Sequence, residues 1–190
     1  VRNSVICRNV GDNHRIYGSG LYMKGGLVDH CVISNNENKV GTRYGGGIAM
    51  TGGRVENTLI VGNDLNKGTG AQTGSGVWMS GGTLANCTVV GNKTGGSGAG
   101  VYVSSGSPQI VNCLIADNLN NKSTPAEASD IDYYNGYDTS LIDHCAIPGC
   151  EVGIATAAPQ FTWALDGRGA AAASEIRVTD GKTEIWRGRG

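Results

Sequence analysis

Apolar and polar residues alternate in short runs along this chain, and the runs recur at a regular interval. The stretch 74–92, GSGVWMSGGTLANCTVVGN, has close copies at 18–36, 45–63 and 98–118. A weaker copy spans 130–150, and half a copy, NSVICRN, opens the chain at Asn3. Within each copy the apolar residues fall on alternate positions, which is the periodicity of a β-strand and not of a helix. The pattern therefore predicts a repeat protein built from short strands.

Five columns of residues stay in step across the copies, although the segments between the copies differ in length. Two columns are aliphatic, one is small, one is asparagine and one is glycine. They are Ile6, Ile33, Ile60, Val89, Ile115 and Ile147; Val1, Val28, Val55, Leu84, Ile110 and Ile142; Ser4, Cys31, Thr58, Cys87, Cys113 and Cys145; Asn9, Asn36, Asn63, Asn92 and Asn118, with Cys150 as the exception; and Gly20, Gly47, Gly76 and Gly100. Repetition of this length indicates a solenoid in which each repeat forms one coil.

The composition distinguishes a β-solenoid from a helical one. Glycine accounts for 32 of 190 residues, whereas helical repeats need few glycines and apolar residues at helical spacing. We therefore predict an all-β parallel β-helix of about six coils, stacked about 4.8 Å apart. The aliphatic columns and the methionines at 23, 50 and 79 should point into the core, and the small column should fit a corner. Stacked asparagine amides should bond one another at a turn.

The repeat resembles that of a known group of proteins. A G-x-G motif, alternating apolar residues and a later asparagine occur here as GGGIAM…LIVGN and GSGVWM…VVGN. They resemble the right-handed parallel β-helix repeats of large bacterial secreted and surface proteins, and are similar to the repeats of chlamydial polymorphic outer membrane proteins. The resemblance covers about residues 1–150 and implies a right-handed, single-stranded β-helix. Because this solenoid also carries pectate lyases, polygalacturonases, tailspikes and adhesins, function has to come from a site.

Past residue 150 the repeat stops, so we expect residues 1–150 to form the solenoid and residues 151–190 to form a cap and a hairpin tail. The segment APQF at 158–161 resembles the D-P-x-F segment that closes such solenoids, and Asp180-Gly181 is typical of a hairpin turn. Val1 already stands in an aliphatic column, and the sequence contains no signal peptide. The chain is therefore expected to be a segment of a longer protein; a natural mature terminus at Val1 is the alternative.

Charge and cysteine content narrow the function classes. The net charge is −1 and no basic stretch occurs, so nucleic acid is not an expected partner. No apolar run is long enough to span a membrane, so we expect no membrane insertion of this segment. Four of the six cysteines stand in the small column and C-x-x-C spacings are absent, so we expect buried free thiols and no metal or cofactor. A disulfide framework, for instance with a Cys145–Cys150 bridge, is the alternative.

Outward positions between the core columns carry the candidate binding residues. Tyr22, Trp78 and Tyr102 stand in one column, which Ala49 interrupts, and rings in a row on a solenoid wall can stack against sugar rings. The alternative is that they cover glycine-rich backbone or pack under loops.

The segments between the copies are expected to be loops, which form either a ligand-binding rim or solvated turns. They are residues 10–17, 37–44, 64–73, 93–97 and 119–129. A further outward column is apolar, and is either a partner surface or a place where the wall turns: Val5, Val32, Leu59, Thr88 and Leu114.

Carboxylates do not form a clear catalytic group. Asp29 and Glu56 would be outward neighbours on adjacent coils, but solenoid glycosidases need a carboxylate pair at a fixed distance, and the motifs of polygalacturonases are missing. His30 and His144 share a column with asparagines, which favours a polar bend over catalysis. We therefore predict a non-catalytic extracellular or cell-surface β-solenoid segment, structural or adhesive, that binds polysaccharide or a cell-surface glycan. The alternative is a fragment of a polysaccharide lyase or glycoside hydrolase of the pectate-lyase-like fold.

Overall fold

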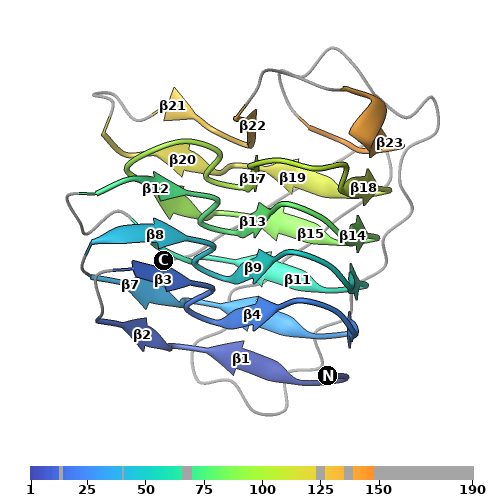
Figure 1. Ribbon diagram of the computed structural model, residues 1–190, viewed down its shortest axis with the longest axis horizontal. Coiled ribbons are helices and arrows are strands. Elements are labelled where there is room, and N and C mark those ends of the chain that lie inside the picture. The colour runs from blue at the N-terminus through green and yellow to red at the C-terminus, as the bar shows by residue number, and fades with distance from the viewer. Residues whose placement is uncertain (13–14, 40, 66–69, 123–126, 135–138, 148–190) are drawn as a thin grey trace, which may run out of the picture.

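The computed structural model describes residues 1–12, 15–39, 41–65, 70–122, 127–134 and 139–147 (Figure 1). The chain forms an all-β parallel β-solenoid of about four turns. The predicted fold is thus confirmed, whereas the expected six coils are too many. The half copy at the N-terminus lacks the first strand of a full repeat, and the copy that begins at residue 130 is described only to residue 147. The cap and hairpin expected at 151–190 lie outside the described residues.

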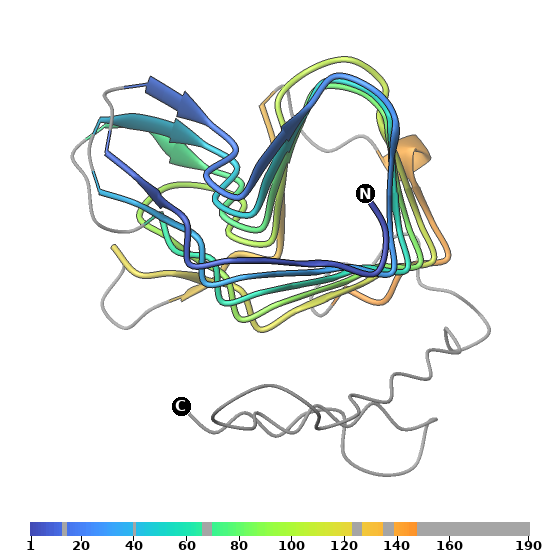
Figure 2. The ribbon, with the colours of Figure 1, turned by 90° about the horizontal axis from the view of Figure 1, so that it is seen from below.

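Three parallel sheets form the walls of the solenoid, and Figure 2 shows them around a common core. Wall 1 contains β1 (Val5–Cys7), β6 (Val32–Ser34), β11 (Leu59–Val61), β15 (Thr88–Val90) and β19 (Leu114–Ala116). Wall 2 contains β5 (Leu27–Asp29), β10 (Arg54–Glu56), β14 (Thr83–Ala85), β18 (Gln109–Val111) and β23 (Ile142–Asp143). Wall 3 contains β4 (Leu21–Met23), β9 (Ile48–Met50), β13 (Val77–Met79), β17 (Val101–Val103) and β22 (Ile131–Tyr133). Each full coil passes from wall 3 through wall 2 to wall 1.

Short strands also occur between wall 1 and wall 3, in the segments expected to be loops, so that expectation was wrong. A three-stranded parallel sheet, which we call the arm, contains β3 (Arg15–Tyr17), β8 (Thr42–Tyr44) and β12 (Gln72–Thr73). The remaining elements are β2 (Val10–Gly11), β7 (Glu37–Asn38), β16 (Lys93–Thr94), β20 (Leu119–Asn120), β21 (Glu127–Ala128) and the 3-10 helix η1 (Thr139–Leu141). Strands of two or three residues are too short to show alternation, and pairing with the next coil defines them.

The strand register confirms the columns. In wall 1, Ile33 pairs with Ile60, which pairs with Val89, which pairs with Ile115, and all four are fully buried. The core cluster also contains the predicted aliphatic and methionine columns of the other walls: Val28, Val55, Leu84, Ile110, Ile142, Met23, Met50 and Met79. Because identical positions of successive coils stack in register, each column buries itself against its own repeats, and no single coil has a core of its own.

The corner between wall 2 and wall 1 is made by residues in the left-handed conformation. Their φ angles lie between 48° and 51°, in the order Asn3, His30, Asn57, Asn86, Asn112 and His144. Asparagine and histidine adopt this conformation more readily than most side chains, so the prediction of a polar bend is confirmed. The small column follows at once, and its thiols donate to nearby carbonyls, as Cys87 Sγ does to Ala85 O at 3.1 Å.

The five described cysteines are free thiols, as expected: Cys7, Cys31, Cys87, Cys113 and Cys145. All except Cys7 are buried. Burial raises the pKa of the Cys113 thiol well above its ordinary value. Hydrogen bonding to Cys113, followed by burial, raises the pKa of Cys145. Cys145 is a free thiol, and Cys150, its partner in the alternative disulfide, lies outside the described residues.

The apolar outward column of wall 1 differs in solvent exposure along the solenoid. Val5, in the first strand, is 67% exposed, whereas Leu59, Thr88 and Leu114 are buried. Only the first member of this column is therefore exposed, and a continuous partner surface along the wall does not form.

A ladder of asparagine amides follows wall 1. Each side-chain oxygen accepts two hydrogen bonds from the asparagine of the preceding coil. Asn63 Oδ1 accepts from the backbone N–H of Asn36 at 3.0 Å and from its Nδ2 at 2.9 Å. The same contacts join Asn63 to Asn92 and Asn92 to Asn118, and these asparagines are fully buried. The other hydrogen of Nδ2 is donated to a backbone carbonyl of the preceding coil, as from Asn63 to Ile33 O at 3.1 Å. The predicted amide stack is confirmed.

The ladder ends on a carboxylate. Asp130 Oδ1 accepts from the backbone N–H and the Nδ2 of Asn118, both at 2.9 Å. Register places Asp130 in the glycine column, one coil after Gly100. A Cβ at Gly100 would lie 2.7 Å from Asn118 Nδ2, so a coil that carries the ladder amide has no room for a side chain there. Asp130 fills that position and supplies the acceptor that the next asparagine would have supplied.

Candidate functional site

The predicted aromatic column exists and faces outward from wall 3. Tyr22 lies on β4, Trp78 on β13 and Tyr102 on β17, in register with Ala49. Asp132 occupies the same column on β22. Tyr22 is 43% exposed, whereas Trp78 and Tyr102 are half-buried. The three rings therefore do not form an equally exposed stripe.

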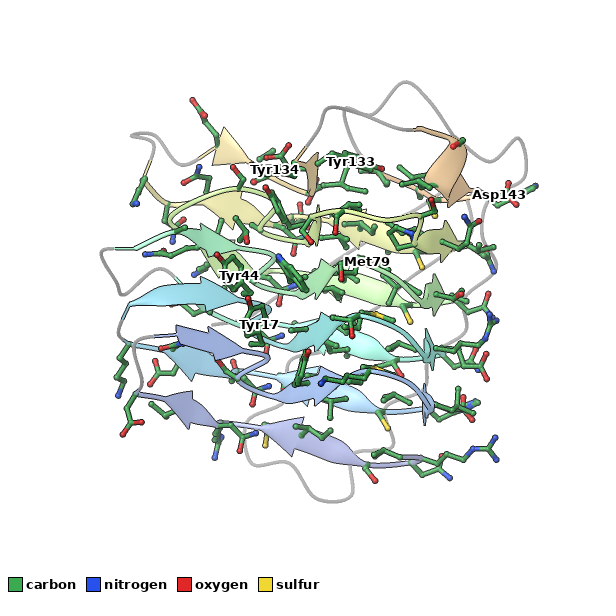
Figure 3. The ribbon with its side chains drawn as sticks, viewed as in Figure 1. Tyr17, Tyr44, Met79, Tyr133, Tyr134 and Asp143 are labelled. Carbon is green, nitrogen blue, oxygen red and sulfur yellow. The ribbon has the colours of Figure 1, made fainter. Side chains whose placement is uncertain are left out.

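Two tyrosines of the arm complete the arrangement. Tyr17 ends β3 and Tyr44 ends β8, and their rings stack with centroids 4.9 Å apart. The Tyr17 ring lies 5.6 Å from Trp78 and 5.9 Å from Tyr22, and the Tyr44 ring lies 5.6 Å from Trp78. We call Tyr17, Tyr22, Tyr44 and Trp78 the aromatic cluster. Figure 2 shows the arm and wall 3 meeting at an angle that opens to the outside, and Figure 3 shows Tyr17 and Tyr44 one above the other.

The small side chain of Ala49 makes room for these rings. Ala49 stands in register between Tyr22 and Trp78, and it is fully buried although its column faces outward. Tyr17 contacts both Tyr22 and Trp78, so its ring bridges the two positions on either side of Ala49. The break in the predicted stripe is thus filled from the neighbouring sheet.

Glycines fix the angle between the arm and wall 3. Gly18, Gly45 and Gly74 follow the arm strands, with φ of 69°, 70° and 65°. These values lie in the left-handed region, which glycine adopts without a steric penalty. A Cβ at Gly45 would also come within 2.2 Å of the carbonyl oxygen of Ile48. The tight corner therefore requires glycine, and it places the tyrosines of the arm against wall 3.

Charged groups stand at both ends of the aromatic column. The ammonium of Lys24 lies 5.9 Å from the centroid of the Tyr22 ring, within the range of a cation–π contact. At the other end, burial raises the pKa of Tyr102, and the carboxylate of Asp132 adds to the effect. The hydroxyl of Tyr102 therefore stays protonated at neutral pH and can donate a hydrogen bond.

The acidic candidates are held at the corner between wall 2 and wall 1. Asp29 and Glu56 are register partners, as expected. Asp29 accepts a hydrogen bond from Asn57 Nδ2 at 3.0 Å and contacts His30 Nδ1 and the guanidinium of Arg2. The hydrogen bond from Asn57 is the main cause that lowers the pKa of Asp29, and His30 and Arg2 act in the same direction. Glu56 pairs with Arg54, and Asp143 repeats the contact with its own neighbour His144.

Within the part of the chain that the structure describes, no group of three or more His, Cys, Asp or Glu side chains is placed to hold a metal ion. No helix in the described residues is long and apolar enough to cross a membrane. The fold and the site define a parallel β-solenoid with an aromatic cluster on its outer surface. Comparison with known protein families, curated proteins and solved structures finds no match.

Sequence reasoning found the wall 3 column but missed Tyr17 and Tyr44, because both lie in segments expected to be loops. A signal for them is present. Each tyrosine stands directly before the glycine motif of its repeat, in YGSG at 17–20 and YGGG at 44–47, and Thr73 holds the same place in TGSG at 73–76. The position is a column of its own, and its register is confirmed by the pairing of Tyr17 with Tyr44 and of Tyr44 with Thr73.

Proposed function

We propose that this chain is a non-catalytic segment of an extracellular or cell-surface β-solenoid of the bacterial secreted type. Its role is structural and adhesive, and it binds polysaccharide or a cell-surface glycan through the aromatic cluster. The observation that supports the proposal is the gathering of four aromatic rings from two different sheets on the outside of the solenoid. Core packing does not require them there, because the walls already enclose a separate aliphatic core.

The chemistry of the cluster suits a sugar polymer. Aromatic rings bury a large apolar area at low entropic cost, and tyrosine and tryptophan add polar edges for hydroxyl groups. Tyr22 is the ring of this cluster that is exposed, so it is the one that an incoming sugar ring can stack on. Trp78 and Tyr102 follow on later coils at a spacing of about 4.8 Å per coil, which suits repeated weak contacts along an extended chain.

The environment of Asp29 and Glu56, the two acidic candidates, supports a non-catalytic role. A glycosidase needs one carboxyl group with a raised pKa that can donate a proton. The pKa of Asp29 is shifted the other way, and its oxygens are occupied by Asn57, His30 and Arg2. Glu56 is likewise engaged by Arg54. These contacts belong to the polar bend of the solenoid and leave neither carboxylate free for acid catalysis.

The binding proposal is tested by affinity electrophoresis in gels that contain hydroxyethylcellulose, xylan or alginate. At least one polymer should retard the wild-type protein. Tyr22→Ala should abolish most of the retardation, whereas Tyr22→Phe, which keeps the ring, should retain it. Val5→Ala is the control for an exposed apolar residue outside the cluster. Equal retardation of Tyr22→Ala and wild type, or no retardation of the wild type by any polymer, would contradict the proposal.

The enzymatic alternative is tested on the same polymers. The protein is incubated with each of them, and new reducing ends and unsaturated products are measured. We expect neither product to accumulate. Turnover that Asp29→Asn abolishes would overturn the non-catalytic proposal in favour of a lyase or hydrolase.

A further inference from the structure

Several buried polar atoms at the angle between the arm and wall 3 lack a hydrogen-bond partner among the described residues. They are Ser19 Oγ, Thr73 Oγ1 and Trp78 Nε1. Buried polar groups in native proteins are nearly always hydrogen-bonded, because an unpaired donor loses its hydration without compensation. Three such atoms at one corner therefore need an explanation.

Two of these atoms flank the same tyrosine. Thr73 ends β12 and is the register partner of Tyr44 in the arm. The Trp78 ring lies 5.6 Å from the Tyr44 ring. Tyr44 is thus a neighbour of both residues, of Thr73 within the arm and of the Trp78 ring on the facing sheet.

We propose that Trp78 Nε1 and Thr73 Oγ1 are the polar recognition groups of the carbohydrate site, and that the Tyr44 ring covers them in the free protein. This inference rests on the proposed function. A sugar hydroxyl can accept from the indole N–H and can both donate to and accept from the threonine hydroxyl. Binding then turns the Tyr44 ring aside and supplies the partners that both groups lack. The ligand class is a saccharide that stacks one ring on Tyr22 and directs a hydroxyl toward the base of the cluster.

This arrangement gives the site its specificity. A site with buried groups that require a hydrogen-bond partner discriminates strongly against ligands that cannot provide one. An apolar polymer can stack on the outer rings, but it leaves the indole N–H and the threonine hydroxyl unpaired. The stacking rings supply affinity for a ring face, and the groups under Tyr44 select a hydroxylated ligand.

The experiment compares variants that remove one polar atom each. Trp78→Phe keeps a ring and removes the N–H, and Thr73→Val keeps the shape and removes the hydroxyl. Thr88→Val is the matched control, because Thr88 Oγ1 is also buried without a partner but lies on wall 1, away from the cluster. Each variant is measured for its dissociation constant with the polymer that most retards the wild type, and for its melting temperature.

Trp78→Phe and Thr73→Val should each weaken binding about tenfold, the equivalent of one lost hydrogen bond. Thr88→Val should bind as the wild type does. Both threonine variants should keep or raise the melting temperature, because each loses an unpaired buried hydroxyl. If Trp78→Phe and Thr73→Val bind like wild type while Tyr22→Ala binds weakly, the inference is wrong and the proposed function stands. If the wild type binds no polymer, both fail together.

Discussion

Replacing Asp130 by alanine should leave the last donors of the asparagine ladder without an acceptor. The carboxylate accepts both the backbone N–H and the Nδ2 of Asn118, and Asn118 is fully buried. A buried donor left without an acceptor costs about 1–3 kcal/mol, so losing the acceptor of two donors should cost about 2–6 kcal/mol. Asp130→Asn keeps an oxygen at the same position and removes the charge, so it should stay within about 1 kcal/mol of wild type.

The assay is urea unfolding at neutral pH, followed by circular dichroism. The midpoint should fall for Asp130→Ala with an unchanged dependence on denaturant, because the change acts on stability and not on the surface exposed by unfolding. Asp132→Asn, at an outward position two residues further on, is the control for loss of an acidic side chain. If Asp130→Ala lowers the free energy of unfolding no more than Asp130→Asn does, the hydrogen bonds that Asp130 accepts do not stabilise the end of the ladder.

The pH dependence of the free energy of unfolding, compared between wild type and Asp130→Asn, provides a second check. Burial raises the pKa of Asp130 above its ordinary value of 3.8, and the hydrogen bonds from Asn118 only partly oppose this. The folded state therefore binds the proton more tightly than the unfolded state. The contribution of Asp130 to stability should increase as the pH falls from its raised folded pKa toward 3.8, and decrease as the pH rises. Relative to Asp130→Asn, the wild type should thus gain stability on acidification; a constant difference would contradict the reasoning.

Three other predictions follow from the core, the thiols and the glycine corner. Ile60→Ala should lower the free energy of unfolding by about 2–5 kcal/mol, measured with urea, because the side chain is fully buried. In thiol titration, Cys7 should react with the native protein at once, whereas Cys113 should react only after denaturation. Gly45→Ala should destabilise the protein and reduce its near-ultraviolet circular dichroism, since the new Cβ meets the carbonyl of Ile48 and displaces the arm; an unchanged spectrum would show that the corner tolerates a side chain.

The walls were predictable from the sequence because stacking repeats the same residue type at the same place. Ile33, Ile60 and Val89 stand in one sequence column and in one structural register. The asparagine ladder and the polar bend at His30 were predictable for the same reason. Each position on one coil has a single neighbour above and one below, so a column in the alignment of repeats is also a set of contacts.

The arm and the end of the ladder were not predictable in the same way. Tyr17 and Tyr44 stand three residues before the glycine column, but at the end of segments whose length varies, which predicts loop and not strand for their column. They reach Trp78 across a corner, through a contact between two sheets that alternation within one strand does not encode. Asp130 was missed because it replaces an asparagine from a different column, and only the three-dimensional register shows that its carboxylate reaches Asn118.

The amide ladder gives the solenoid a direction. Every rung donates toward the C-terminal end and accepts from the N-terminal side, so any two neighbouring rungs are interchangeable. A whole repeat inserted before Asp130 would have a donor on its N-terminal side and an acceptor on its C-terminal side. It would lengthen the rod by about 4.8 Å. Insertion after Asp130 has no such continuity, because a carboxylate offers no hydrogen to the next rung. The number of repeats is therefore free to vary along the rod, while the point at which the ladder stops is encoded in one residue.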